Sequence, residues 1–342
     1  MKSRWIAGLL ALSLATIPAA GQIQAQAVEK HILRMAFLIP RSQSVVIEFK
    51  KWEKRLSDAT GGRLGLQVFF GGSAGDEKDV LRKMRAGQID GTAITTASMS
   101  QFVRQVLVMD APGLFTNYAQ VDAVRHELAS EFNDEAYANG FKVMGWGDFG
   151  RVRIFSKDPI RRLADFRRMR PWVWDEHPNM REFYSVIGVT GVPLGLPEVY
   201  GGLQTNMVDT VFASALAALA LQWFTKTPNV SKDSVGFINA GMVIARPKWD
   251  SLPADIQTTL TNLATQYNGT VVDTLRRGDD ETYQRLLQRG IHPNDIEDRP
   301  EWDKVGKKLR EKFVGRLYSR ETLTRAEAVV ARHPDHAAHP AH

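Results

Sequence analysis

Apolar positions in the first third of the chain switch between the spacing of helices and the spacing of strands. Residues 45–56 carry apolar side chains at steps of four, three and four, which places them on one face of a helix. Residues 64–70 alternate as in a strand with one buried face. Residues 32–39 form an apolar run that suits a buried strand, 80–84 the apolar side of a second helix, and 89–95 a further strand. This alternating order predicts an α/β lobe with a largely parallel sheet.

A second α/β segment follows. FKVMGWGDFG, residues 141–150, predicts a strand that runs into a glycine-rich turn. The other expected elements are strands at 169–174, 188–194 and 207–214 and helices at 179–188 and 197–206. Residues 255–291 are predicted to be mostly helical, because Ile256, Leu260 and Leu263 recur at steps of four and three.

The N-terminus has the pattern of a secretory signal peptide. A cationic head, MKSR, precedes thirteen apolar residues from Trp5 to Ile17 and an Ala-x-Ala sequence that ends at Ala27. The apolar run is too short for a permanent membrane span, although an uncleaved anchor is the alternative. We therefore expect cleavage after residue 27 and a mature chain in the bacterial periplasm.

Composition narrows the functional classes. Cysteine is absent, which excludes thiol chemistry, thiolate metal centres and a lipid anchor on cysteine. The formal charge of +6 becomes +4 without Lys2 and Arg4 and is spread along the chain, so it gives no reason to expect nucleic acid binding. The C-terminus carries His333, His336, His339 and His342, whose constant spacing could capture a metal ion incidentally, but no metal site or cofactor is expected.

Six phrases of the sequence resemble a known family. They are TGGRLGLQVFFGG (60–72), GDEKDVLRKMRAGQIDGTAIT (75–95), VLVMDAPGLF (106–115), GFKVMGWGDFG (140–150), PEVYGGLQTNMVD (197–209) and PKWDSLPADIQTTL (247–260). Their order and spacing over residues 32–290 are similar to those of the periplasmic substrate-binding receptors of tripartite ATP-independent (TRAP) transporters, of the dicarboxylate-receptor type. The resemblance implies a two-lobed flytrap that closes on a small organic molecule, usually a carboxylate, and presents it to a membrane permease. We expect the protein to be a monomer.

The resemblance also implies a division of the chain. The expected parts are a signal peptide (1–27), lobe I (28–150), lobe II with the hinge strands (151–245), C-terminal helices including a long one across both lobes (246–325), and a disordered histidine-rich tail (326–342). In open α/β sheets, ligands bind beyond the carboxyl ends of the strands. The loops expected there begin at 71, 145, 174 and 213.

Two positions depart from the family pattern. The arginine that clamps the ligand carboxylate in most such receptors is replaced by Trp172, and the common asparagine of a later strand by Ala213, next to Phe212. Arg170 lies two residues before Trp172, hence on the same face of a strand, and could substitute for the clamp. Glu77 occupies a place where family members often contact ligand.

Other residues are candidates on chemical grounds. Arg151 or, preferably, Arg153 could hold an anion, because a guanidinium matches both oxygens of a carboxylate. Alternatively, both arginines are solvated or paired with Asp148. Asp76, next to Glu77, is a further candidate ligand-binding residue, and the alternative is that both acids stabilise a helix N-terminus.

Tryptophans could provide a wall for an aromatic or apolar ligand, or a face for a cation. Trp172 and Trp174 share one strand face, Trp174 being expected at the cleft edge, and Trp146 and Trp223 could complete a box. The alternative is that these indoles are core residues.

Two alternatives to a transport receptor are an exported enzyme and a receptor that signals to a membrane partner. An exported enzyme on the same fold would need catalytic machinery, but the sequence has no nucleophile elbow, no metal-spaced His–Glu pair and no phosphate loop. A receptor that signals to a membrane partner would need no such machinery and stays open. We therefore expect a solute receptor that is not an enzyme.

Overall fold

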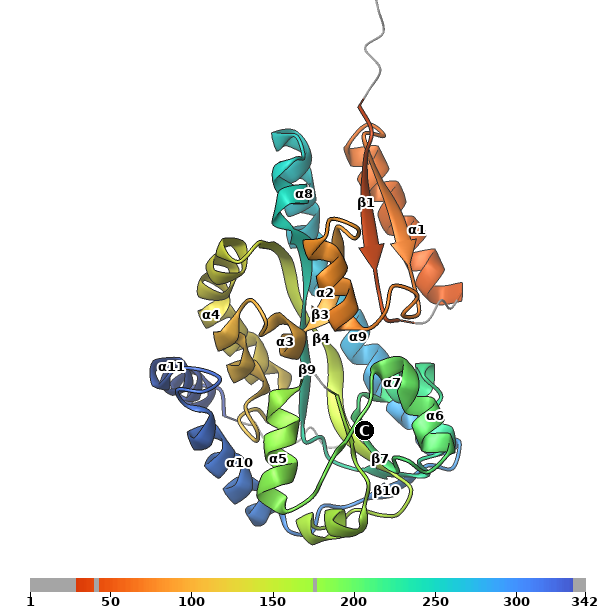
Figure 1. Ribbon diagram of the computed structural model, residues 1–342, viewed down its shortest axis with the longest axis vertical. Coiled ribbons are helices and arrows are strands. Elements are labelled where there is room, and N and C mark those ends of the chain that lie inside the picture. Colours follow the sequence, from red (N-terminus) through yellow and green to blue (C-terminus); the bar gives the residue numbers. More distant parts are fainter. Residues whose placement is uncertain (1–28, 40–42, 175–176, 335–342) are drawn as a thin grey trace, which may run out of the picture.

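The computed structural model describes residues 29–39, 43–174 and 177–334, which form two lobes stacked along the long axis of the molecule (Figure 1). The predicted signal peptide lies outside the described residues. Each lobe combines strands and helices, and an eight-stranded mixed sheet with the strand order β10-β8-β4-β9-β3-β1-β2 runs through both, with β7 paired to β4.

Lobe I contains the strand and helix order predicted for residues 32–95. Its elements are β1 (His31–Ala36), α1 (Gln43–Ala59), β2 (Leu64–Phe69), α2 (Glu77–Arg85), β3 (Gly91–Thr95), α3 (Thr96–Met99), η1 (Arg104–Asp110), α4 (Tyr118–Ala138) and α8 (Arg246–Asp250). Strand β1 pairs in parallel with both β2 and β3, as expected for strands joined by crossover helices. The hydrophobic core of lobe I lies on both faces of this sheet, with Leu33 and Leu56 on one side and Leu81 and Leu107 on the other.

Lobe II is built from shorter elements. They are η2 (Leu163–Arg168), β5 (Trp172–Val173), α5 (Pro178–Ile187), β6 (Val192–Pro193), η3 (Leu196–Glu198), α6 (Val199–Gln204), β7 (Thr210–Ala213), α7 (Ala215–Ala220), η4 (Trp223–Thr225), β8 (Asn229–Ser231) and β10 (His292–Asn294). The strands predicted at 169–174 and 188–194 are confirmed but reduced to two residues each, which pair in parallel outside the main sheet.

Three long elements join the lobes. Strand β4 (Phe141–Ser156) pairs with β9 (Gly236–Ala245) over most of its length and then with β7 and β8 in lobe II. Helix α9 (Ala254–Gln288) has 35 residues, a length of about 50 Å at 1.5 Å per residue, and packs along β4. The predicted long helix and the two-lobed arrangement with crossing strands are therefore confirmed (Figure 1).

The glycine-rich segment 145–150 is not the turn that the sequence predicted. It continues β4, with register shifts between Val143 and Gly145 and between Asp148 and Arg151. A Cβ on Gly145 would lie 2.5 Å from the Asn268 side chain of α9, and similar contacts recur along the segment. The glycines are needed because the helix approaches the strand closely, and this tertiary requirement looks like a turn signal in the sequence.

The C-terminal region is more ordered than predicted. Helices α10 (Arg299–Phe313) and α11 (Arg320–Ala331) pack against α5 and α4 respectively. The disordered tail was expected from residue 326, but α11 continues to Ala331 and buries Ala326 and Val329 in the core of lobe I. The histidines at 336, 339 and 342 lie outside the described residues. Among the helices of the described ranges, none is long and apolar enough for a membrane span.

Candidate ligand-binding cleft

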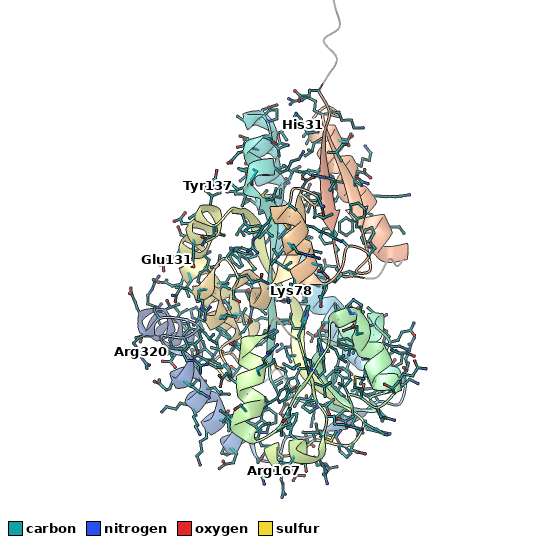
Figure 2. All side chains as sticks on the ribbon, in the orientation of Figure 1. His31, Lys78, Glu131, Tyr137, Arg167 and Arg320 are labelled. Atoms are coloured by element: carbon teal, nitrogen blue, oxygen red, sulfur yellow. The ribbon has the colours of Figure 1, made fainter. Side chains whose placement is uncertain are left out.

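A cavity of about 750 Å³ lies between the lobes. Both lobes and the crossing strands line it, mostly with apolar side chains, and its volume is within the usual range for small-molecule sites. Helix α2 begins at this junction, and Figure 2 shows Lys78, one residue after Glu77, near the middle of the molecule. The aromatic residues of the lining are Phe37, Phe115, Phe149, Trp172, Trp174, Phe183, Phe212, Trp223, Phe237 and Trp302.

Trp172 begins β5 and Trp174 directly follows this strand, and the two side chains have different environments. Trp172 is 5% exposed, donates its Nε1–H to the Leu194 carbonyl at 2.9 Å, and has Trp223 edge-on at 5.3 Å. Trp174 is half-buried and stacks on Trp172, with ring centroids 5.9 Å apart and planes inclined by 29°. Trp172 thus supports Trp174 from behind, while Trp174 has the ring that is more accessible from the cleft.

Asp76 connects the two lobes. It caps the N-terminus of α2, where its Oδ1 accepts the Glu77 backbone N–H at 2.8 Å. Its Oδ2 accepts from Trp174 Nε1 and from the Leu196 backbone N–H, both at 3.0 Å. The helix-capping alternative weighed for Asp76 is therefore what the structure shows, with an added contact across the cleft.

Glu77 is buried at the floor of the cavity. Its carboxylate accepts the backbone N–H of Thr95 at 3.1 Å and the Thr95 hydroxyl at 2.7 Å. Burial raises the pKa of Glu77 to about 7, against the opposing effect of these hydrogen bonds. A carboxyl group at this position is close to its midpoint at neutral pH.

A second acidic group, Asp110, was not singled out from the sequence. It ends η1, and the Thr96 hydroxyl lies 2.7 and 2.8 Å from its two carboxylate oxygens. Burial raises the pKa of Asp110 to about 7. The signal that could have identified it is a single acid within the apolar run VLVMDAPGLF, where burial demands partners or a function.

Two polar residues of lobe II line the cavity, and one of them contacts Asp110. Asn179 on α5 is 5% exposed and donates its Nδ2–H to the Asp110 carbonyl at 3.2 Å, while its Oδ1 is buried and finds no partner in the described part of the chain. His177, just before α5, is partly exposed, but its Nδ1 is buried and likewise lacks a partner there. Burial lowers the pKa of His177 to about 4, so its ring is neutral at physiological pH.

Arg153 and Arg151 do not line the cavity. Arg153 is 6% exposed, stacks over the Tyr283 ring of α9 at 4.0 Å and lies 3.8 Å from the Asp279 carboxylate. Arg151 lies over the Tyr118 ring at 4.5 Å. Their placement gives no support to the predicted clamp, which stays a prediction.

Three other predicted residues also lie away from the cavity lining. Asp148 is buried in an ion-pair network with Arg125 of α4 and Arg276 of α9, so it does not pair with Arg151 or Arg153 as the alternative had supposed. Arg170 is on the surface, where its Nε donates to Asp209 at 3.1 Å. Trp146 donates its Nε1–H to Asn133 of α4 at 2.9 Å.

Phe212 and Ala213 at the end of β7 both line the cavity. Ala213 pairs with Arg153 in the ladder between β7 and β4. Phe212 belongs to a cluster with Phe166, Phe183 and Tyr184 in lobe II, so the cavity wall is continuous with that core.

No group of acidic residues and histidines within the described residues is arranged to hold a metal ion.

The family model of the bacterial extracellular solute-binding proteins, family 7 (DctP), matches residues 35–316. The chain belongs to this family. The resemblance to receptors of TRAP transporters is thus confirmed, and the periplasmic location of relatives accords with it.

Family 7 relatives share the fold at low sequence identity. The C4-dicarboxylate-binding periplasmic protein DctP of Vibrio cholerae is 24% identical over 206 residues, which cover 60% of this chain and 62% of that protein. The 2,3-diketo-L-gulonate-binding periplasmic protein YiaO of Escherichia coli is 21% identical over 313 residues, 91% of this chain and 92% of that protein. The crystal structure of a TRAP periplasmic solute-binding protein from Desulfovibrio salexigens with bound orotic acid superposes with a TM-score of 0.80 at 19% identity, covering 89% and 99% of the two chains.

Proposed function

We propose that this family 7 solute-binding protein captures one small organic molecule in the interlobe cleft and delivers it, as a monomer, to a TRAP-type membrane permease. The observation that carries the proposal is the cavity of about 750 Å³ whose walls come from both lobes. A ligand in that position contacts both lobes at once, so its binding energy favours the closed form. The predicted signal peptide at 1–27 supports export to the periplasm.

The relatives bind organic acids, namely C4-dicarboxylates, 2,3-diketo-L-gulonate and orotic acid. We propose an organic acid here too, but one with an apolar or aromatic body. The support is the lining, in which Trp174, Phe212 and Glu77 face the cavity with Trp172 and Trp223 behind them. A planar body would stack on Trp174, an arrangement that contributes about 0.5–1.5 kcal/mol beyond burial.

The proposed role is binding rather than catalysis. The support is that family 7 proteins are solute-binding receptors. The hinge of the proposed motion is the β4–β9 pair, which crosses near the expected boundary at residue 150. A receptor for a signalling partner would share these features and differ only in its membrane partner.

A thermal-shift screen tests the proposal directly. Mature protein is heated with dicarboxylates, 2-oxo acids, sugar acids, aromatic acids, alcohols and amines. A true ligand at about a hundred times its Kd stabilises the folded state by about 2.7 kcal/mol and raises the melting temperature measurably. Silence across the whole screen would contradict a receptor function, and turnover of a compound would reinstate the enzyme alternative.

A further inference from the structure

One end of the cavity, where α3, η1 and α5 meet, offers hydrogen-bond acceptors but no cation among the described residues. Asp110 has two carboxylate oxygens that share one hydroxyl, from Thr96, and a long contact of 3.4 Å from Asn239 Nδ2. An ionised carboxylate has about four acceptor positions, so Asp110 retains capacity for further donors. No salt bridge involves Asp110 or Glu77 within the described residues.

Asn179 indicates the kind of partner that is missing. Its Nδ2 donates to the Asp110 carbonyl, which fixes the orientation of the amide and leaves Oδ1 as the free atom. An amide oxygen can only accept, and a buried acceptor without a partner costs about 1–3 kcal/mol. A ligand that donates at this point would recover that cost, whereas a carboxylate would not.

Two side-chain donors at this end already donate to other groups of the protein. Thr96 donates to Asp110, and Asn239 Nδ2 donates to the Met109 carbonyl at 2.7 Å. His177 is neutral, so it supplies no positive charge at this end, although one of its ring nitrogens carries an N–H. The arginines that line the cavity are Arg285 and Arg299, and both are exposed and bonded elsewhere, to Thr282 and Asp233.

We propose that the ligand places a hydrogen-bond-donating group, a protonated amine or a hydroxyl, on Asp110 and Asn179. Any carboxylate that the ligand carries then points away from this end, because two acidic side chains would oppose it and no described residue there offers a positive charge. This inference rests on the proposed receptor function and specifies which end of the ligand is buried.

Matched probes test the inference on the wild-type protein. 2-Phenylethylamine, 2-phenylethanol and 3-phenylpropanoate share one body and differ in the end group, and equivalent triads can be made with indole and cyclohexane bodies. We expect the amine or the alcohol to bind at least about tenfold more tightly than the carboxylate in each triad that responds. The better of the two identifies the donor as an ammonium or a hydroxyl. A carboxylate that binds most tightly in every responding triad overturns the inference.

Variants then locate the donor site. Asp110→Asn and Asn179→Ala should each weaken the best probe about tenfold, while Asp273→Asn, an exposed carboxylate on α9, should leave its Kd unchanged within about twofold. If either variant is unstable, the triad comparison on the wild type still decides.

If the triads are silent while the broad screen finds a ligand without an N–H or O–H donor, the inference fails and the receptor function stands. If both are silent, the receptor function itself fails.

Discussion

Trp174 of lobe II donates its indole N–H to Oδ2 of Asp76 in lobe I, at a distance of 3.0 Å. The same oxygen accepts the Leu196 backbone N–H, so one carboxylate of α2 holds two donors of the opposite lobe. These bonds exist only when the lobes are together, because Asp76 and Trp174 belong to different lobes. Trp174 therefore combines two tasks: its ring faces the cavity and its N–H stabilises closure.

Trp174→Phe separates these two tasks. Phenylalanine keeps an aromatic face but loses the N–H, and a hydrogen bond to a charged group contributes about 1.5–3 kcal/mol. We expect ligand affinity, measured by isothermal titration calorimetry, to fall about tenfold or more, and small-angle scattering to show less of the compact form. Trp146→Phe is the matched control, since it loses a comparable indole bond to Asn133 outside the cavity. Equal losses in both variants would contradict the role of the Asp76 bond.

Arg153→Ala distinguishes a ligand clamp from a structural residue. The clamp hypothesis requires a loss of about 2–5 kcal/mol in binding free energy. The structure instead places Arg153 on Tyr283 and beside the buried Asp279. Removing one member of such a pair should lower the free energy of unfolding by about 3 kcal/mol, measured by urea denaturation, with ligand affinity within about twofold. The opposite pattern, lost affinity at unchanged stability, would restore the clamp.

Gly150→Ala tests why β4 is rich in glycine. Gly150 has φ of +103°, and a Cβ there would lie 2.6 Å from Asp279 Cγ, so the strand and α9 would have to separate. We expect a loss of at least about 2 kcal/mol in the free energy of unfolding, from strain and from the displaced helix. Gly236→Ala is the control on the neighbouring strand β9, because no atom lies within 4 Å of its Cβ position. Comparable stability of the two variants would show that α9 does not need this approach.

The order of elements could be predicted from the sequence because burial imposes the helical and strand periods locally. The long helix α9 and the order of strands and helices in residues 32–95 follow from that periodicity. The face on which a β4 side chain lies could not be predicted, since the register shift between Asp148 and Arg151 breaks the alternation on which such a prediction depends. Arg153 consequently lies toward α9, away from the cavity.

The meeting of Asp110 and Asn179 at one end of the cavity could not be predicted from the sequence either. Asp110 and Asn179 are 69 positions apart and meet only because α5 of lobe II packs near η1 of lobe I. Asp110 stands in the family phrase VLVMDAPGLF, but no local rule brings it together with Asn179. Trp174 was expected at the cleft edge, but its hydrogen bond to Asp76, 98 positions away, likewise follows from the meeting of the lobes.

The raised pKa of Glu77 predicts how stability changes with pH. Below about pH 4.5 the Glu77 carboxyl is protonated in both the folded and the unfolded chain, so it does not make the free energy of unfolding depend on pH. As the pH rises to about 7, the folded chain holds a proton that the unfolded chain has released, and the free energy of unfolding falls by about 3 kcal/mol in total. Asp110, whose pKa is also raised to about 7, acts in the same direction.

Urea denaturation of the ligand-free protein between pH 4.5 and 7.5 should therefore show declining stability, and Glu77→Gln should flatten the decline. Glu281→Gln, exposed on α9, provides the control that keeps the wild-type slope. An unchanged slope in Glu77→Gln would mean that ordered water or open lobes keep this carboxyl solvated, and the cavity would then be wetter than its apolar lining implies.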